Sequence, residues 1–573
     1  MATVARISIE RRSLISKVAD RFATILSSES RQGYRLSGLA LLAAFIPVAI
    51  VQCILGAPPI EGPWNVAILL DGAWRMIQGQ AAQTDFYNPI GPMTDLFTAI
   101  GMKIATPSTS SITYGVVILA ALILPLVWRI AKHRLPWALA LLCTILAGTY
   151  LLSPRPPGWT IRFTGYAMIY NRESYVVFMA LCLCLFLKRR YPSRRSEYVD
   201  GAIAGMLLAL LLYWKITYFV AAVGVTACAA VLIPRVSRWY LAAMAAVAGV
   251  CLALFVFVGV SLPRYVANVR YAVKAQLPAM RYQLLWASLN HNAMWMYLLA
   301  FCLVLLTWTW SRGKTPPFAI TRIWLASVAL LGATLFIESG NSSQGGGLED
   351  PLYFITAVIA FESFRRIDPR QVARPDSSTR TAFAASFAVI LPLFFGTIVL
   401  GDSVAYAYSV AWDCVRRPHI PVSQRFHSAP LSDFYVPTST THNTAYWPAR
   451  DFPARINDGI DLLRKHLQPG DRITTLSFTN PFNFALGIKP ARDRIVFWDP
   501  HVTYDPANPP ATPAQYLGDA TVVMVPRLLD RSTGCCFETA DVMIGLNSGY
   551  LHDHFHEVES TPTWTLYRRN PAP

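Results

Sequence analysis

The segment that decides the fold reads Ile68-Leu-Leu-Asp-Gly-Ala-Trp-Arg-Met-Ile-Gln-Gly-Gln80, and it continues as Thr84-Asp-Phe-Tyr-Asn-Pro-Ile-Gly-Pro-Met93. It follows the first long apolar run of the chain, near 36–56. Two carboxylates, Asp71 and Asp85, therefore lie in a loop beside lipid, next to a rigid Pro-Ile-Gly-Pro turn. Acids in such a place are unusual enough to suggest chemistry at the membrane surface.

Apolar runs recur along the first 400 residues. Hydrophobic residues make up 54% of the 573-residue chain, 14% are charged, and the mean hydropathy is +0.37. Because each run approaches the ~20 residues that a helix needs to cross a bilayer, we expect a polytopic α-helical membrane protein with about eleven transmembrane helices. The pair 201–214 and 217–233 is short, and it forms either two spans or one re-entrant hairpin. The runs lie near 36–56, 112–131, 135–153, 174–188, 201–214, 217–233, 239–260, 291–310, 319–338, 351–364 and 381–400.

The placement of Lys and Arg predicts the orientation. Segments on the side of the N-terminus hold 25 of these residues and the opposite loops hold 10. The positive-inside rule therefore places the N-terminus in the cytoplasm and, with an odd number of spans, the last 170 or so residues outside a bacterial-type inner membrane, in the periplasm. The net charge of +17 reflects this asymmetry and contact with anionic membrane lipids. No helix-turn-helix, zinc finger or RNA-binding signature occurs, so no nucleic-acid partner is expected.

Three regions follow from these patterns. Residues 1–35 are basic and form either an amphipathic helix on the inner leaflet or a disordered tail. Residues 36–402 form the membrane domain, whose first outer loop, 57–111, has apolar spacing that predicts helices near 66–77 and 93–104. Residues 403–573 turn soluble and predict a periplasmic connection followed by a small α/β domain. Its expected elements are a helix over 456–467 and strands over 472–478, 521–525 and 564–568. An interfacial helix is expected within 261–290.

The loop acids have structural and chemical interpretations. Asp71 precedes Arg75 by four residues, so the two could form a surface ion pair worth ~0.3–0.5 kcal/mol, and Asp85 could cap the Tyr-Asn-Pro turn. Alternatively, a carboxylate beside lipid can take a proton from an attacking hydroxyl. Trp74, Tyr87 and Asn88 lie in the same loop as candidate sugar-binding groups.

Several cations are predicted on the same outer side. Lys215 stands between two apolar runs, where an ionisable group usually marks a site, although it could also snorkel to the interface. Such cations could bind a phosphate or diphosphate, and the alternative for each arginine is a contact with lipid headgroups. The candidates are Lys215, Arg172, Arg162, Arg264 and Lys274.

Three further features have weaker signals. The polar loop that begins at Glu338 could hydrogen-bond sugar hydroxyls through Glu338, Asn341 and Gln344, or it could be a glycine-rich linker. On a strand, His552, His554 and His556 would share one face and could bind a metal. This spacing alone is a weak signal for a metal site, and it favours an exposed polar strand edge. Cys414 could form a disulfide with either Cys535 or Cys536.

The chain resembles the GT-C superfamily of polytopic glycosyltransferases, which includes the lipid A aminoarabinose transferase and the protein O-mannosyltransferases. The resemblance rests on the long first outer loop with Leu-Leu-Asp71-Gly-Ala-Trp and Thr-Asp85-Phe-Tyr-Asn-Pro, on the many spans and on the outer C-terminal domain. It implies a polyprenyl-phosphate sugar donor, a glycan, lipid or protein acceptor, inversion of the anomeric centre, and Asp71 as base with Asp85 in support.

The chain also departs from that pattern. Many members carry two adjacent acids where this chain has Asp71-Gly72, which leaves a requirement for a divalent cation (Mg or Mn) open. A different class remains as the alternative, namely a non-catalytic transporter of lipid-linked sugars or an envelope-glycan assembly protein. Transporters often show repeated halves, and we find no internal repeat.

Overall fold

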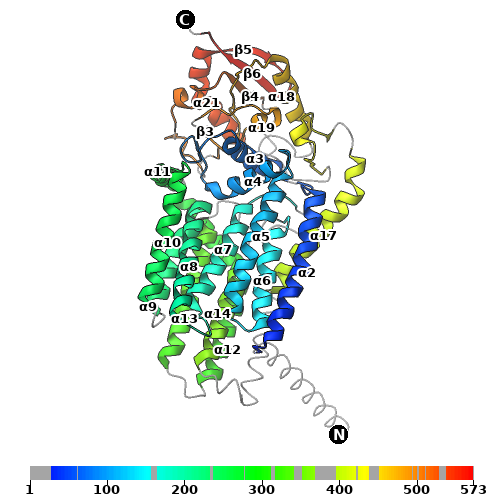
Figure 1. Cartoon of the computed structure of the whole chain (residues 1–573). Helices are drawn as coiled ribbons and strands as arrows, with labels where there is room; N and C mark the ends of the chain where they lie inside the picture. The colour runs from blue at the N-terminus through cyan, green and yellow to red at the C-terminus, as the bar shows by residue number, and fades with distance from the viewer. Residues whose placement is uncertain are drawn as a thin grey trace, which may run out of the picture.

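The computed structural model is mostly helical, with the N-terminal and C-terminal ends of the chain at opposite ends of the molecule (Figure 1). A bundle of long helices carries a smaller α/β domain on one end. The structure describes residues 28–60, 62–155, 164–232, 237–275, 278–311, 317–340, 351–367, 395–420, 424–437, 451–492, 494–499, 503–509, 511–527 and 537–571.

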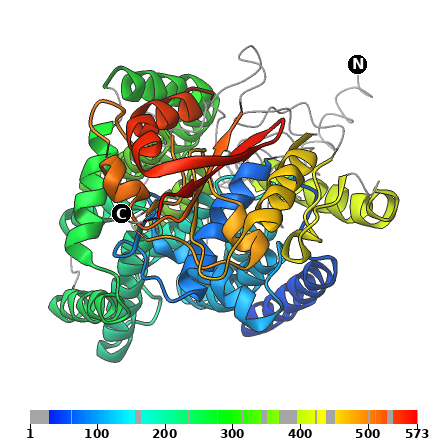
Figure 2. The same cartoon turned by 90° about the horizontal axis from the view of Figure 1, so that it is seen from above.

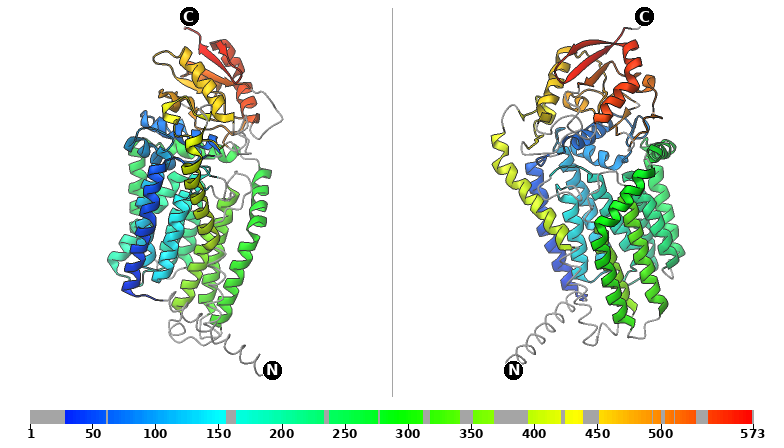
Figure 3. Two further views of the ribbon diagram at one scale, coloured as in Figure 1. Left: turned by 90° about the vertical axis from the view of Figure 1, so that its right-hand side faces the viewer. Right: turned by 180° about the vertical axis from the view of Figure 1, so that it is seen from behind.

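The apolar runs form the helices of the bundle, and the chain is a multi-pass membrane protein. Six of the described helices are long and apolar enough to cross a membrane, or seven if the bent α12 is one span. Helices α2 and α17 cross along one edge of the bundle (Figure 3). The bundle helices are α2 (Arg31–Leu55), α5 (Ser111–Lys132), α6 (Trp137–Leu152), α7 (Ile169–Phe186), α8 (Arg194–Trp214), α9 (Ile216–Leu232), α10 (Arg238–Phe257), α12 (Pro278–Ser311), α13 (Pro317–Ser339), α14 (Pro351–Ile367) and α17 (Thr397–Val415).

Some sequence-based expectations about the bundle need adjustment. The count of eleven spans is not confirmed, and most of the run 381–400 lies outside the described residues. Helix α17 passes through the expected boundary at 402–403, because one side of the helix stays buried beyond that point, at Ala405, Ser409 and Asp413. The expected interfacial helix is α11 (Leu262–Ala275), while the second half of that loop opens the long helix α12.

The first outer loop lies between the bundle and the C-terminal domain (Figure 1). As predicted, it forms two helices, α3 (Pro63–Ile77) and α4 (Pro92–Ile104), and each begins with a proline. Gly91, just before α4, has a φ of 116°. A Cβ there would meet the main-chain oxygen of Tyr213 at 2.5 Å, so only glycine lets the turn pack against the end of α8.

The C-terminal domain is built on a four-stranded sheet of order β2-β4-β6-β5. Strand β2 (Ile473–Thr475) pairs parallel with β4 (Val522–Pro526), and β6 (Trp564–Arg569) pairs antiparallel with β4 and β5 (Phe555–Ser560). These strands and helix α18 (Phe452–His466) confirm the expected elements. The remaining helices are α19 (Phe482–Leu486), α20 (Pro513–Leu517) and α21 (Phe537–His554).

The expected strand with three alternating histidines was wrong. Helix α21 extends to His554, so His552 and His554 belong to its last turn, and only His556 lies on a strand. The apolar side chains of α21 pack on the sheet with helical spacing, and this packing overrides the alternating pattern.

The C-terminal domain is joined to the first outer loop. Strand β1 (Phe86–Tyr87) pairs parallel with β3 (Arg494–Ile495). The Gln80 side chain donates to the carbonyl of Pro490 (2.7 Å) and the Trp74 indole to that of Ile488 (2.8 Å). Seen from above, the domain lies over the middle of the bundle (Figure 2). The loop is therefore held on both sides, which fixes the side chains between bundle and domain.

Candidate active site

Asp71 lies in the middle of α3 and is almost fully buried, with 1% of its surface exposed. Its Oδ2 accepts a hydrogen bond from Nε of Arg75 at 2.8 Å. The expected ion pair therefore exists, but its expected surface position was wrong, because both side chains are covered by the C-terminal domain. Arg75 also donates to the main-chain oxygen of Ala491 (2.8 Å), which ties the pair to that domain.

A second buried acid, Asp95, comes from the first turn of α4. A Cβ on Gly72 would lie 2.6 Å from the Asp95 carboxyl group. The carboxyl group thus occupies the space that a side chain after Asp71 would need, which explains the glycine at that position. The Asn88 amide donates to Asp95. We did not single out Asp95 from the sequence.

Glu173 in the first turns of α7 supplies a third buried carboxylate. Its Oε2 accepts hydrogen bonds from the Thr94 hydroxyl and from the Trp214 indole, both at 2.7 Å. Thr94 is the neighbour of Asp95 on α4, and the Glu173 charge acts on Asp95. Three acids from three elements therefore converge where the loop meets the bundle, an arrangement that we name the junction cluster (Asp71, Asp95 and Glu173).

The junction cluster holds three carboxyl groups, and the ion pair described above gives a cationic partner, Arg75, to one of them. Burial raises the pKa of Asp71, against the opposing effect of Arg75. Burial, together with the charges of Asp71 and Glu173, holds the pKa of Asp95 well above its usual range. Two like charges this close cannot both be ionised without cost, and Arg75 favours the charge on Asp71 and the proton on Asp95.

Unsatisfied polar atoms gather at this point. Among the described residues, no hydrogen-bond partner is found for Oδ1 of Asp71, Oδ1 of Asp95 or the side-chain amide of Asn483 in α19. The Asn483 amide still lies close enough to favour the charged form of Asp71. Buried polar groups are normally paired, so such a group of unpaired atoms points to a ligand or water held among them.

Lys215 is placed on the same end of the bundle. It separates α8 from α9, its Nζ donates to Oδ1 of Asn171 (3.1 Å), and it lies 4.9 Å from the centre of the Tyr170 ring. Asn171 precedes Glu173 by two residues, and Trp214, which binds Glu173, precedes Lys215. Lys215 therefore lies next in the chain to Trp214, a hydrogen-bond partner of Glu173 in the junction cluster, and its phosphate-binding role stays a prediction.

A polar cavity of about 310 Å³ lies on the other side of the loop. It is bounded by β1, α11 and the C-terminal domain. A hydrogen-bonded chain links it to the junction cluster, since Asn268 donates to Gln83 (2.9 Å), Gln83 to the main chain of Asn88, and Asn88 to Asp95. Amides and aromatic rings dominate the lining, which includes Gln83, Tyr87, Arg264, Asn268, Trp498 and Tyr516.

Other expected site residues have local roles. The expected capping role of Asp85 was wrong, because its carboxylate accepts from the amide of Ala81 (2.9 Å), while Asn88 holds the turn by accepting from Ile90. Arg172 donates to the carbonyls of Tyr150 (2.7 Å) and Arg155 (2.8 Å), and so caps α6.

The remaining expected residues make other contacts or lie outside the described structure. Trp74 packs edge-on against Phe484 at the domain interface. Glu338 is buried at the end of α13 and accepts from Asn292. Lys274 is exposed on α11. Outside the described residues lie Arg162, Asn341, Gln344, Cys535 and Cys536, together with most of the basic N-terminal segment.

No protein family model matches the chain, and no curated protein matches it. Its structure is similar to that of ArnT from Cupriavidus metallidurans in the apo state, with a TM-score of 0.49 and 12% identity over 92% of this chain and 98% of that one. ArnT bound to undecaprenyl phosphate gives 0.47, 11% identity and the same coverage of both chains. The arabinofuranosyltransferase AftD from Mycobacteria gives 0.40 and 14% identity over 95% of this chain and 40% of that one.

These solved structures are of GT-C glycosyltransferases, the group that the sequence resembles. Every TM-score is below 0.5, so this likeness assigns neither a catalytic residue nor a substrate to the chain.

Proposed function

We propose that the protein is a membrane glycosyltransferase that moves a sugar from a polyprenyl-phosphate donor to a hydroxyl of a glycan, lipid or protein acceptor. The observation that supports it most is the junction cluster, with its unpaired oxygens on Asp71 and Asp95 and the facing amide of Asn483. Stability alone does not favour such a group, because buried carboxylates that leave an oxygen unpaired destabilise a fold. Chemistry at this position would account for its presence.

Asp71 is the base in this proposal. The acceptor oxygen attacks the anomeric carbon, the bond from that carbon to the phosphate oxygen breaks, and the acceptor proton passes to Asp71. The sugar is transferred with inversion, and the lipid leaves as polyprenyl phosphate. Burial raises the pKa of the Asp71 carboxyl group, which makes it a better proton acceptor than an ordinary surface aspartate, while Arg75 favours its ionised form.

Lys215 holds the donor phosphate. It stands between two membrane helices, so it can reach a phosphate at the end of a lipid chain as a point charge. The polar cavity of about 310 Å³ takes the sugar-bearing acceptor, because amides bind hydroxyls and aromatic faces pack on sugar rings. The hydrogen bonds that run from Asn268 through Gln83 and Asn88 to Asp95 would couple acceptor binding in the cavity to the junction cluster.

A divalent cation fits part of this site. Within the described residues, no group of three or more His, Cys, Asp and Glu side chains is arranged to hold a metal ion. If Asp95 gives up its proton, the Oδ1 atoms of Asp71 and Asp95 would be the groups that hold Mg²⁺, which commonly takes one or two carboxylates and completes its shell with substrate phosphate and water. When bound, such an ion would neutralise the leaving phosphate.

The distribution of Lys and Arg supports an outer, periplasmic location for this site and a bacterial-type inner membrane for the bundle. The test is turnover of the purified protein with a panel of polyprenyl-phosphate sugars and glycan or lipid acceptors. We expect one donor to release polyprenyl phosphate and to label an acceptor. Tight binding of a donor without transfer to any acceptor would favour the alternative transporter or assembly protein.

A further inference from the structure

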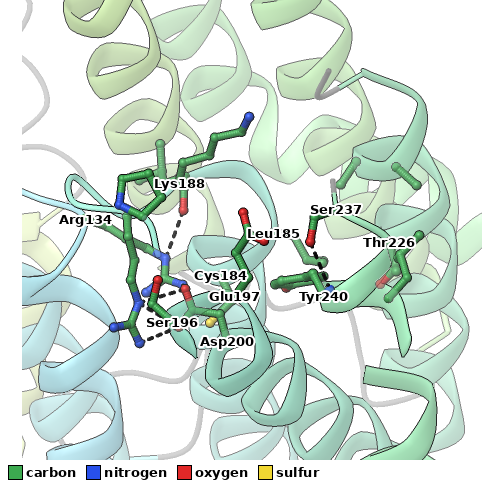
Figure 4. A pocket seen from close by; sticks show the side chains of 16 residues that line it. Arg134, Cys184, Leu185, Lys188, Ser196, Glu197, Asp200, Thr226, Ser237 and Tyr240 are labelled. Carbon is green, nitrogen blue, oxygen red and sulfur yellow. Dashed lines mark hydrogen bonds and ion pairs between the residues drawn. The ribbon is translucent and has the colours of Figure 1, made fainter. Parts of the chain in front are cut away.

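Figure 4 shows the side chains that line a second cavity, of about 300 Å³. The helix ends that form it lie at the end of the bundle opposite the C-terminal domain (Figure 1). It opens where α7 ends and where α8 and α10 begin. The proposed glycosyl transfer does not use it, since its lining shares no residue with the junction cluster or with the polar cavity.

One wall of this cavity is charged. Arg134 and Arg189 both form ion pairs with Asp200, at 2.5 and 2.6 Å. These three side chains form the floor of the cavity. The exposed Lys188 adds a further positive charge at the edge. Outside the lining, Arg194 and Arg238 each lie over the Trp239 ring, at 4.3 and 4.8 Å from its centre. Glu197 also lines the cavity, so three basic side chains stand against two carboxylates, and the lining keeps a small positive excess.

The cavity also contains a donor without an acceptor. The hydroxyl of Tyr240 is buried in it, and no hydrogen-bond partner for that oxygen occurs in the described part of the chain. Ser237, three residues earlier, caps the first turn of α10, so the amides at that helix end add to the positive field. A buried phenol of this kind calls for an acceptor from a bound molecule.

The opposite wall is apolar and faces the outside of the bundle. Ala229 and Ala230 of α9 and Leu241 of α10 line it, and α10 has no fully buried residue along its length. Its outer surface carries exposed apolar side chains such as Val250 and Leu254. An occupant thus meets cations and a hydroxyl donor on one side and a lipid-facing apolar surface on the other.

We propose that this cavity binds the phosphate headgroup of an anionic phospholipid of the leaflet on that side, with acyl chains along α9 and α10. The headgroup phosphate accepts from the Tyr240 hydroxyl and pairs with Lys188, while the Arg134–Asp200–Arg189 group keeps the floor rigid. Basic pockets between membrane helices on the cytoplasmic side are known to favour anionic headgroups.

The test is lipid retention by the purified full chain, measured by native mass spectrometry after exchange into phosphatidylglycerol or phosphatidylcholine. We expect wild type to retain phosphatidylglycerol about tenfold better than phosphatidylcholine, because the choline ammonium offsets the negative charge that the basic side chains attract. Tyr240→Phe, which keeps the ring, should reduce the retention of phosphatidylglycerol about fivefold or more, because the hydrogen bond to the phosphate is lost. Lys188→Ala should reduce the preference for phosphatidylglycerol by a similar factor. Arg129→Ala, an exposed arginine at the same end but outside the cavity, should leave it unchanged.

Three results would overturn the proposal. The first is equal retention of the two lipids by wild type, and the second is an equal loss of preference in Arg129→Ala. The third is complete displacement of the lipid by inorganic phosphate at matched concentration, which would indicate a site for a free anion.

Discussion

Asp71 at the junction and Asp471 in the C-terminal domain are both buried aspartates that bind an arginine. Both oxygens of Asp471 are used, by Arg568 (3.1 and 3.0 Å), by the Thr521 hydroxyl (2.8 Å) and by the amide of Gln468 (2.8 Å). Asp71 has one such bond, and its other oxygen is left without a partner among the described residues.

The difference also appears in the acidity of the two groups. Burial alone would raise the pKa of Asp471, but its hydrogen bonds to Arg568, Gln468 and Thr521 outweigh burial and lower it. At the junction burial prevails, and the pKa values of Asp71 and Asp95 are raised. A satisfied acid stabilises its domain, whereas an unsatisfied one is available to a substrate.

The largest expected effect is on catalysis. Asp71→Asn removes the proposed base while keeping the size of the side chain, so the turnover number should fall by about 10²–10⁴, as is typical for a lost general base. The KM for the donor should change little, because Lys215 is intact. Initial rates over a range of donor concentrations give the turnover number and the KM separately. An unchanged turnover number would show that Asp71 is not the base.

Next comes the stability of the C-terminal domain. Asp471→Asn leaves the Arg568 guanidinium without its carboxylate, and it should lower the free energy of unfolding by about 1–3 kcal/mol. Transfer activity per folded molecule should stay at the wild-type level, because Asp471 touches neither the junction cluster nor the polar cavity. Thermal melting in detergent measures the first quantity, and a loss of specific activity would show that the two regions are coupled.

Gly72→Ala tests how the two junction acids pack. The added Cβ would lie 2.6 Å from the Asp95 carboxyl group, and overpacking of this kind costs about 1–3 kcal/mol. We expect a lower melting temperature and roughly tenfold slower transfer, because Asp95 must move away from Asp71. The matched control is Gly545→Ala in α21, where nothing lies within 4 Å of the added atom. Equal behaviour of the two variants would contradict the contact.

The smallest effect concerns pH. Because the folded-state pKa of Asp95 is raised, the native state holds a proton that the unfolded state has released, and stability falls as the pH rises from about 4 towards the folded-state pKa. In wild type this fall in the free energy of unfolding is at most about 1.4 kcal/mol per pH unit. Asp95→Asn should abolish it. Asp471 acts in the opposite sense, since its lowered pKa costs stability only as the pH falls below about 4. Melting curves of both variants from pH 3 to 8, roughly the range in which carboxyl groups titrate, would show the two slopes, and parallel curves would contradict the assignment.

Much of the fold could be predicted from the sequence. The spacing of apolar residues indicated the bundle, the two helices of the outer loop and the strands that begin near 473, 522 and 564. Local periodicity carries this information because each element buries one face. The same reasoning found Asp71 and Lys215, since a charge between apolar runs is visible without a fold.

The partners of Asp71 could not be predicted in this way. Asp95 is 24 residues further along the chain, and it meets Asp71 only because Gly72 lets α4 pack closely on α3. Its position on a buried stripe with Thr98, Ala99 and Met102 was the available signal. Asn483 comes from a different domain, and its approach depends on how that domain docks on the loop.

The most direct test of the central claim uses wild type, Asp71→Asn and Asp471→Asn side by side. In one quenched reaction, the polyprenyl phosphate released and the sugar transferred are both measured per folded molecule. We expect equal amounts of the two products, formed at similar rates by wild type and Asp471→Asn, and a joint loss of at least about 10²-fold in Asp71→Asn. Transfer by Asp71→Asn at the wild-type rate, or donor binding by wild type without any release of polyprenyl phosphate, would contradict it.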